Sequence, residues 1–120
     1  MKRNWDVIRS ILMKVEDLPN QHSHVLSNEI EGIKEDVAEY HMRLLGEAGL
    51  IIGANLDRES GTCTARKLTW DGHEFLDGIK RETVWRRIKD TLQDKGLDLS
   101  YETIKSAVIS LTAVVLRSSF

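Results

Sequence analysis

The chain of 120 residues has one cysteine, one proline and eight glycines, and these low counts exclude several classes of protein. A lone cysteine forms no internal disulfide, so a disulfide-stabilised scaffold is excluded and a reducing cytosol is favoured. The few prolines and glycines exclude a disordered or fibrous chain. The longest apolar run, 113–116, is far too short to span a bilayer, and the charged first residues 1–6 contain no signal-peptide core. We therefore expect a cytoplasmic protein.

The chain also lacks an excess of positive charge and the common catalytic signatures. Its 17 basic and 19 acidic residues give a net charge of −2, which excludes a nucleic-acid-binding coat over the whole chain. The 41% of apolar residues are enough for one compact domain of this length. No G-x-S-x-G, P-loop, dinucleotide fingerprint or H-E-x-x-H occurs. We expect no enzymatic activity and no cofactor.

Helical and strand-like patterns alternate along the chain. Asn4 can cap a first helix that ends at Pro19, and a second helix spans 34–49, where Gly49 tolerates a left-handed end. Turn-forming residues at 57–61 lie between two strand-like runs, which predicts a hairpin. The remaining expected elements are a short strand within 21–27 and helices at 69–79, 84–95 and from 101, the last capped by Ser100.

This order of elements predicts an α+β winged helix with two additional C-terminal helices. The core is expected at 1–80, with the wing hairpin at about 50–68. The helical extension at 81–120 is expected to pack on the core or to mediate dimerisation. About sixteen residues separate the first two helices, so the second helix of a helix-turn-helix is reduced to at most one turn, around 28–31.

Several of these segments resemble a known family. The segments 1–6, 45–51 and 68–76, together with the pair Tyr40-His41, are similar to a family of small bacterial and phage proteins known as Domain of Unknown Function 2513. The resemblance covers about the first two thirds of the chain and is weakest beyond Lys95. It implies a winged-helix fold and a bacterial or phage source. It implies no assigned activity, so no functional residues are transferred.

Two functions fit this fold, and local charge distinguishes them. The helix before the hairpin usually reads DNA, but 34–49 carries two basic and four acidic residues. The wing region 57–67 has three basic and two acidic residues. The segment 80–95 has six basic and three acidic residues, so it either contacts the phosphates of DNA or is a solvated helix face. The candidate DNA contacts are Lys2, Arg3, Arg43, Arg58, Arg66 and Lys67.

The alternative is a protein-interaction module that uses the acidic face of the helix at 34–49. Its candidate contacts are Glu35, Asp36, Glu39 and Arg43. A continuous negative surface around these residues would favour a protein partner over DNA, because carboxylates repel phosphates.

The histidines, the cysteine and the tryptophans are expected to have structural rather than functional roles. No residues with metal-ligand spacing accompany the histidines, so no metal site is predicted. We expect His41 and His73 to be hydrogen-bonded structural residues and Cys63 to be an unreactive thiol. The tryptophans expected to pack in the core are Trp5, Trp70 and Trp85.

The last helix carries an apolar stripe that one protomer does not need for its core. The stripe consists of Ile104, Val108, Leu111 and Val115. It predicts a homodimer with a two-fold axis, because soluble monomers seldom expose such a stripe. The alternative is that the helix packs on the preceding helix at 84–92 of its own chain.

Overall fold

The computed structural model describes residues 1–56 and 61–119. The chain forms two compact units, Met1–Leu76 and Asp77–Phe120. None of the described helices combines the length and apolar content needed to cross a membrane.

The first helix, α1 (Trp5–Glu16), begins at the predicted cap. The side-chain oxygen of Asn4 accepts hydrogen bonds from the backbone N–H groups of Asp6 at 2.9 Å and Val7 at 3.3 Å. These bonds satisfy two donors that have no partner within the helix. The buried face of α1 comprises Trp5, Val7, Ile8, Ile11, Leu12 and Val15. The Trp5 ring lies 5.9 Å from the ring of Phe75, between the centroids.

A short strand and a single turn connect α1 to the next helix. The strand is β1 (Val25–Leu26), and the turn is the 3-10 helix η1 (Ser27–Glu29). Glu29 stabilises this turn, since its carboxylate accepts a hydrogen bond from the Leu26 N–H at 2.8 Å. The one turn expected here is therefore present, one residue earlier than predicted.

Helix α2 (Glu35–Glu47) confirms the second predicted helix, but its buried face is rotated. Ala38, His41, Met42 and Leu45 are buried. The helical spacing of the apolar residues in 34–49 instead predicts a buried stripe of Val37, Tyr40, His41, Leu44, Leu45 and Ala48. Tyr40 and Leu44 are only half-buried, and Ala48 is exposed. The chain then reverses at Gly49, whose φ of 74° suits a residue without a side chain.

The predicted hairpin is present, but each arm is divided into two short strands. The strands are β2 (Ile51–Ile52), β3 (Asn55–Leu56), β4 (Cys63–Ala65) and β5 (Lys67–Leu68). The first arm is interrupted at Gly53, where φ is 91°. Opposite this position the stem of Arg66 lies so close that a β-carbon on Gly53 would approach its Cγ to 2.5 Å. The interruption therefore depends on glycine at this position.

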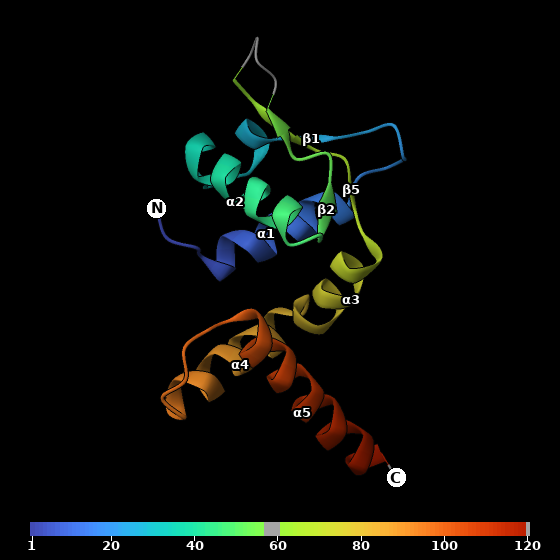
Figure 1. Cartoon of the computed structure of the whole chain (residues 1–120). Helices are drawn as coiled ribbons and strands as arrows, with labels where there is room; N and C mark the ends of the chain where they lie inside the picture. The colour runs from blue at the N-terminus through green and yellow to red at the C-terminus, as the bar shows by residue number, and fades with distance from the viewer. Residues whose placement is uncertain (57–60, 120) are drawn as a thin grey trace. The chain divides into compact units, whose positions relative to one another are not determined.

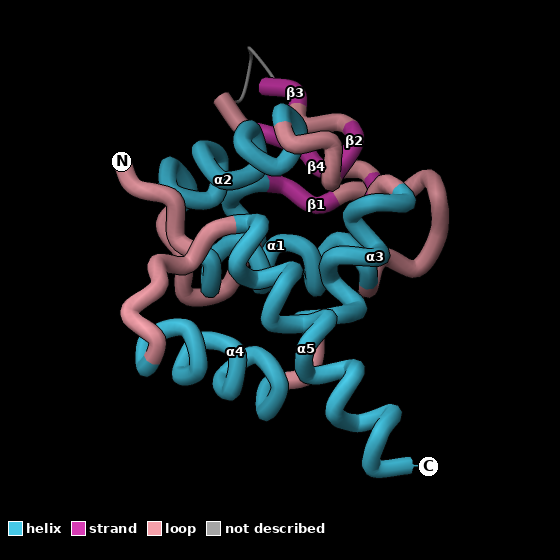
Figure 2. Tube along the Cα trace, turned by 60° about the horizontal axis from the view of Figure 1, so that its bottom comes forward, coloured by secondary structure: helices cyan, strands magenta, loops and turns pink. Residues whose placement is uncertain are grey.

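Two small antiparallel sheets result. One has the order β1-β4-β3, with Val25 opposite Ala65 and Leu56 opposite Cys63. The other pairs β2 with β5, with Ile51 opposite Leu68. Helix α2 lies alongside β2 and β4 (Figures 1 and 2). The chain is thus α+β, with helices and small antiparallel sheets.

Helix α3 (Trp70–Ile79) begins at Thr69, as expected. The Thr69 hydroxyl accepts a hydrogen bond from the Gly72 N–H at 3.0 Å and donates to the Gly49 carbonyl at 2.6 Å. The start of α3 therefore lies against the end of α2. The expectation that Trp70 packs in the core is wrong, because its side chain is 79% exposed; Trp5 and Trp85 are buried as predicted.

The second unit contains α4 (Glu82–Asp94) and α5 (Tyr101–Ser119). Gly96, with a φ of 69°, follows α4, and the Ser100 hydroxyl accepts a hydrogen bond from the Thr103 N–H at the start of α5. The buried side chains of this unit include Trp85, Ile88, Leu92 and Ile104. The C-terminal part of α5 extends away from α4 (Figures 1 and 2).

Candidate functional site

The outer face of α2 carries a stripe of charged residues at four-residue intervals. Glu35, Glu39, Arg43 and Glu47 follow one another along the helix, with Asp36 beside the first. All are exposed except Glu39, which is half-buried. Residues spaced by four are neighbours on a helix surface, so three carboxylates, of Glu35, Glu39 and Glu47, form a row that one cation interrupts, with the Asp36 carboxylate beside it.

That cation is neutralised by its neighbour. The Arg43 guanidinium lies 3.3 Å from a carboxylate oxygen of Glu39, with the side chains 49% and 27% exposed. Arg43, which the sequence assigned to both candidate interfaces, is therefore held on the helix surface by an acid. The stripe consequently presents net negative charge to a partner, even where its arginine lies.

A groove separates this face from the first hairpin arm. It encloses about 430 Å³ and is lined by Arg43, Gly46, Glu47, Ile51, Gly53, Ala54 and Asn55. Gly46 permits the close approach of the two walls, since a β-carbon there would lie 2.8 Å from the β-carbon of Ala54. Three of the seven lining residues are thus small, and Arg43 and Glu47 add one charge of each sign. Apart from Gly46 and Gly53, no lining residue is a sequence signal that predicts this groove.

The underside of α2 is anchored by a buried histidine. The Nε2 atom of His41 accepts a hydrogen bond from the Asn4 N–H at 2.8 Å, and its Nδ1 donates to the Val37 carbonyl at 2.8 Å. Both bonds together require the neutral ring with its proton on Nδ1. The expectation that His41 is a structural, hydrogen-bonded residue is confirmed, although its side chain is fully rather than partly buried.

Cys63 lies in β4 and is also fully buried. Its backbone N–H donates to the Ser27 hydroxyl at 3.0 Å. Burial raises the pKa of the Cys63 thiol, and the charge of Arg43 opposes this effect in part. The thiol is therefore protonated at neutral pH, and an unreactive structural cysteine is what such an environment produces.

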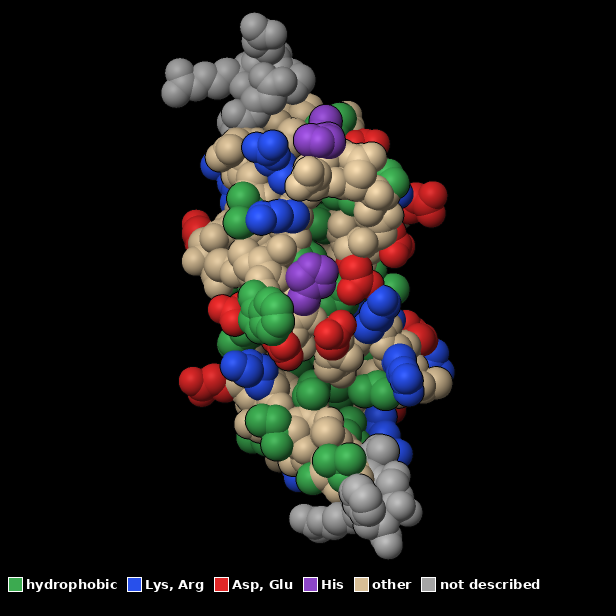
Figure 3. All heavy atoms as spheres, turned by 90° about the vertical axis from the view of Figure 1, so that its right-hand side faces the viewer, with side chains coloured by type: hydrophobic (Ala, Val, Ile, Leu, Met, Phe, Trp, Pro, Cys, Tyr) green, Lys and Arg blue, Asp and Glu red, His purple; other side chains and the backbone are tan. Residues whose placement is uncertain are grey.

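The basic residues predicted to contact DNA do not lie together. Lys2 and Arg3 precede α1, whereas Arg66 and Lys67 line a hollow of about 170 Å³ that also includes Val15, near the other end of that helix. A helix of twelve residues is about 18 Å long, so the two groups are separated by roughly that distance. On the face shown in Figure 3, basic and acidic side chains are interspersed rather than segregated.

Two of these basic residues have further constraints. The Arg3 guanidinium lies 4.6 Å from the centroid of the Trp5 ring, a cation–π contact that holds it near α1. Arg58, predicted at the hairpin tip, lies outside the described residues.

The remaining histidines offer no metal centre in the described part of the chain. No group of three or more His, Cys, Asp or Glu side chains is close enough there to hold an ion. His22 and His24 are exposed. His73 is exposed as well, although it borders the hollow next to β5 rather than being partly buried as expected.

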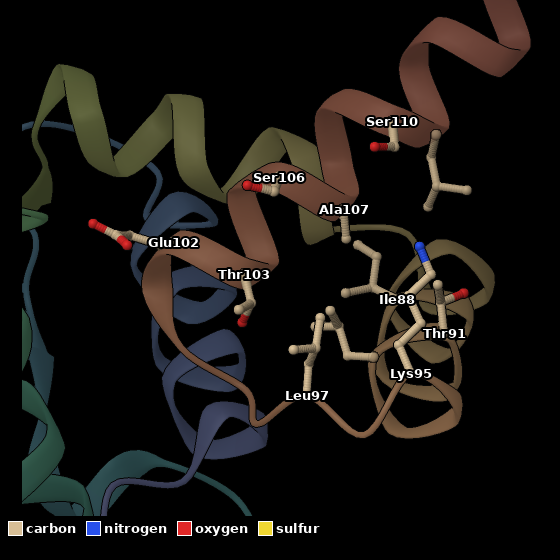
Figure 4. Close-up of a pocket in the computed structure, with 11 residues that line it drawn as sticks. Ile88, Thr91, Lys95, Leu97, Glu102, Thr103, Ser106, Ala107 and Ser110 are labelled. Carbon is tan, nitrogen blue, oxygen red and sulfur yellow. The ribbon is translucent and has the colours of Figure 1, made fainter.

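The residues predicted for a dimer interface divide into two groups. Ile104 is fully buried, and Val108 packs so closely on Gly78 that a β-carbon there would lie 2.7 Å from a Val108 methyl group. Ile104 is therefore covered within the chain, whereas Val108 is half-buried, and the dimer interface stays a prediction. Leu111 is half-buried and borders a groove between α4 and α5 (Figure 4). The side chain of Val115 lies outside those that the structure describes.

Comparison with known proteins gives the family. The family model described as "Hypothetical protein (DUF2513)" matches residues 2–98. The chain belongs to the DUF2513 family. A DUF2513 match of this extent includes both the candidate site on α2 and the whole of α4. A protein of Haemophilus influenzae, described as uncharacterized, is 40% identical to this DUF2513 chain over 117 residues, which cover 97% of the chain and 99% of the relative. No solved structure matches the chain.

Proposed function

We propose that this chain is a non-catalytic winged-helix module that binds a basic segment of a protein partner on α2. The winged-helix assignment is supported by the order of α1, η1 and α2 before the hairpin. It is also supported by the sheet order β1-β4-β3, in which the strand between the first helices joins the second hairpin arm. The observation that carries the function is the row of carboxylates on α2, with Arg43 paired to Glu39.

Electrostatics favour a basic partner over a nucleic acid at this surface. The unit Met1–Leu76 has nine basic and thirteen acidic residues, a net charge of −4. Charged groups interact within a screening length of about 8 Å at physiological salt, so the carboxylates on α2 act together on anything that contacts the helix. A phosphate backbone is repelled there, whereas lysine or arginine side chains are attracted.

The adjoining groove favours an extended segment. Its walls include the small residues Gly46, Gly53 and Ala54, and Asn55 adds a neutral amide near the acidic rim of Glu47. Such a surface suits a peptide whose main chain lies in the groove and whose basic side chains reach the carboxylates. Affinity would come from several weak charge pairs rather than from one deep pocket.

Duplex DNA is the second candidate, and a specific observation supports it. Arg66 and Lys67 are both exposed on the second hairpin arm, and the stem of Arg66 is held across Gly53. A wing placed on DNA through these two residues, with α2 turned away, would make few phosphate contacts. Binding would be weak, independent of sequence and lost at moderate salt.

Fluorescence anisotropy distinguishes the two candidates. The probes are a labelled Lys-Gly repeat peptide and a labelled random-sequence duplex, each titrated from about 50 to about 300 mM salt. We expect the peptide to bind at low salt and the duplex not to bind. Replacing Glu35→Gln and Glu47→Gln together should weaken peptide binding roughly 3- to 10-fold. The matched control Asp94→Asn with Asp98→Asn removes the same charge from the second unit and should have little effect.

The opposite pattern overturns the proposal. If the duplex binds and the peptide does not, the function is DNA binding, and Arg66→Ala with Lys67→Ala should then weaken the duplex and flatten its salt dependence. If both acidic double variants weaken the peptide equally, the binding reflects total charge rather than the site on α2.

A further inference from the structure

The side chain of Trp70, the first residue of α3, is the most exposed large hydrophobic group in the described part of the chain, at 79%. The other two tryptophans are buried, and each has a cation of its own chain at its ring. The Arg3 guanidinium lies 4.6 Å from the centroid of Trp5, and the Lys89 ammonium lies 5.4 Å from that of Trp85. Among the described residues no cation lies over the ring of Trp70. This ring is therefore open to a group from another molecule.

The backbone that carries Trp70 is fixed by the residues around it. The Thr69 hydroxyl donates to the Gly49 carbonyl at 2.6 Å and accepts from the Gly72 N–H at 3.0 Å. A β-carbon on Gly72 would collide with the Leu50 carbonyl, so the first turn of α3 lies directly against the chain that follows α2. A partner that covers the ring therefore does not have to order this backbone first, which lowers the entropic cost of binding.

The surroundings of the ring on α3 are acidic. The helix contains three acidic residues and no lysine or arginine. Asp71 follows Trp70 directly, and Glu74, four residues after Trp70, is its neighbour on the helix surface. Both carboxylate side chains are exposed. Asp71 also lies in the first turn, where its charge offsets the positive end of the helix dipole. A cation that approaches the ring is thus attracted by two carboxylates.

We propose that Trp70 stacks on an arginine side chain of the basic segment that binds α2. The inference rests on the function proposed for α2 and adds a residue type to its partner. Gly49 lies two residues after Glu47, at the end of the acidic stripe, and Thr69 directly precedes Trp70. Because Thr69 is bonded to Gly49, the backbones of Glu47 and Trp70 lie within about 18 Å of each other, a distance that about six extended residues span.

The ring and the carboxylates together favour arginine over other occupants. An apolar side chain would cover the ring but remove water from Asp71 and Glu74 without offering them a partner. A nucleic-acid base would stack, but its phosphates would approach the same two carboxylates. The ammonium of lysine is compact and strongly hydrated. The planar guanidinium of arginine stacks on an aromatic face and keeps its N–H groups available for carboxylates.

Fluorescence anisotropy on the full chain tests the proposal with two labelled peptides of equal length and charge, an Arg-Gly repeat and a Lys-Gly repeat, at about 50 mM salt. The wild type should bind the arginine peptide roughly 2- to 5-fold more tightly than the lysine peptide. Trp70→Leu should abolish this preference, because it keeps an apolar side chain and removes the aromatic face, whereas Trp70→Phe should retain part of it. Ile52→Ala is the matched control, since it truncates another exposed apolar side chain of the same unit, and it should leave the preference unchanged.

Tryptophan emission gives a second readout. The unlabelled arginine peptide should change the emission of the exposed ring in the wild type and cause no such change in Trp70→Leu, because Trp5 and Trp85 are buried. Equal dissociation constants for the two peptides, or a preference that survives Trp70→Leu, overturn this inference and leave the function proposed for α2 in place. An arginine preference that depends on Trp70 but not on Glu35 and Glu47 overturns the function proposed for α2 alone. Binding of neither peptide overturns both.

Discussion

The two units of the chain differ in charge and in how completely each covers its apolar residues. The unit Met1–Leu76 has a net charge of −4 and, among its described residues, leaves three large hydrophobic side chains exposed: Met1, Ile52 and Trp70. The shorter unit Asp77–Phe120 has a net charge of +2 and, among the side chains that the structure describes there, exposes four: Leu97, Ile109, Val114 and Leu116.

The two units therefore offer different kinds of surface to a partner. In the first unit, helices and strands enclose a core, and its charged surface on α2 is available for a polar, salt-dependent contact. In the second unit, two helices leave an apolar groove, so its missing contacts are apolar.

The largest expected effect tests the core of the first unit. Leu45 is 2% exposed on α2, so Leu45→Ala removes buried methyl groups and leaves a cavity. The cost should be about 2–5 kcal/mol of unfolding free energy, a large part of the stability of a small domain. Urea unfolding followed by circular dichroism measures it. A melting temperature within a few degrees of the wild type would contradict the observed orientation of α2.

A matched deletion in the second unit sharpens the comparison. Ile104 is 0% exposed, so Ile104→Ala should also cost about 2–5 kcal/mol. Both losses should be the same at every protein concentration, because each side chain is covered within its own chain. A loss for Ile104→Ala that changes with protein concentration would mean that another copy of the chain covers this side chain.

A smaller effect is expected from the tie between the N-terminus and α2. His41→Ala removes the acceptor for the Asn4 N–H and the donor to the Val37 carbonyl. Leaving buried polar groups without partners costs about 1–3 kcal/mol. Hydrogen exchange at the Asn4 amide should accelerate in parallel with the lost stability. The exposed His73 serves as the control, since His73→Ala should change stability by less than about 0.5 kcal/mol.

Helix ends were the structural features that the sequence predicted best. Local rules correctly predicted the cap at Asn4, the left-handed residue Gly49 and the caps Thr69 and Ser100. Each depends on one or two neighbouring residues, so the information is contained in a short segment. The spacing of Glu39 and Arg43 also permitted prediction of their ion pair, which the sequence analysis did not make.

Features that depend on distant segments were not predictable in this way. Trp70 stands at the start of a helix whose Phe75, Leu76 and Ile79 are buried, but its own side chain is exposed. The groove beside α2 arises because Gly46 meets Ala54, and the division of the hairpin arises because Arg66 crosses Gly53. An apolar pattern predicts that a helix has a buried face. The segments that pack against the helix determine which side chains form that face, and on α2 they bury Met42 while Tyr40 stays half-buried.

The buried thiol of the first unit predicts a pH effect. Burial raises the pKa of Cys63 in the folded chain, so its contribution to stability is fully present below the pKa of the unfolded thiol, about 8.5. Above that pH the unfolded chain loses the proton first, and stability should fall by at most about 1.4 kcal/mol per pH unit until the folded thiol ionises too. Urea unfolding between pH 8 and pH 10 measures this slope. Cys63→Ala should remove this component, and equal slopes in both proteins would contradict a protonated buried thiol.

The smallest expected effect compares one surface ion pair from each unit. Both pairs place a glutamate four residues before an arginine, the favourable order on a helix. Arg86 and Glu82 are 3.6 Å apart with side chains 68% and 59% exposed, whereas Glu39 is only 27% exposed beside Arg43 at 3.3 Å. A double-mutant cycle should give at most about 0.3 kcal/mol for the first pair and about 0.5–1 kcal/mol for the second, because partial burial weakens screening. Repeating both cycles in about 1 M salt should remove most of the difference. Equal coupling at low salt would mean that α2 presents Arg43 as freely as α4 presents Arg86, and the negative character assigned to the α2 surface would then be wrong.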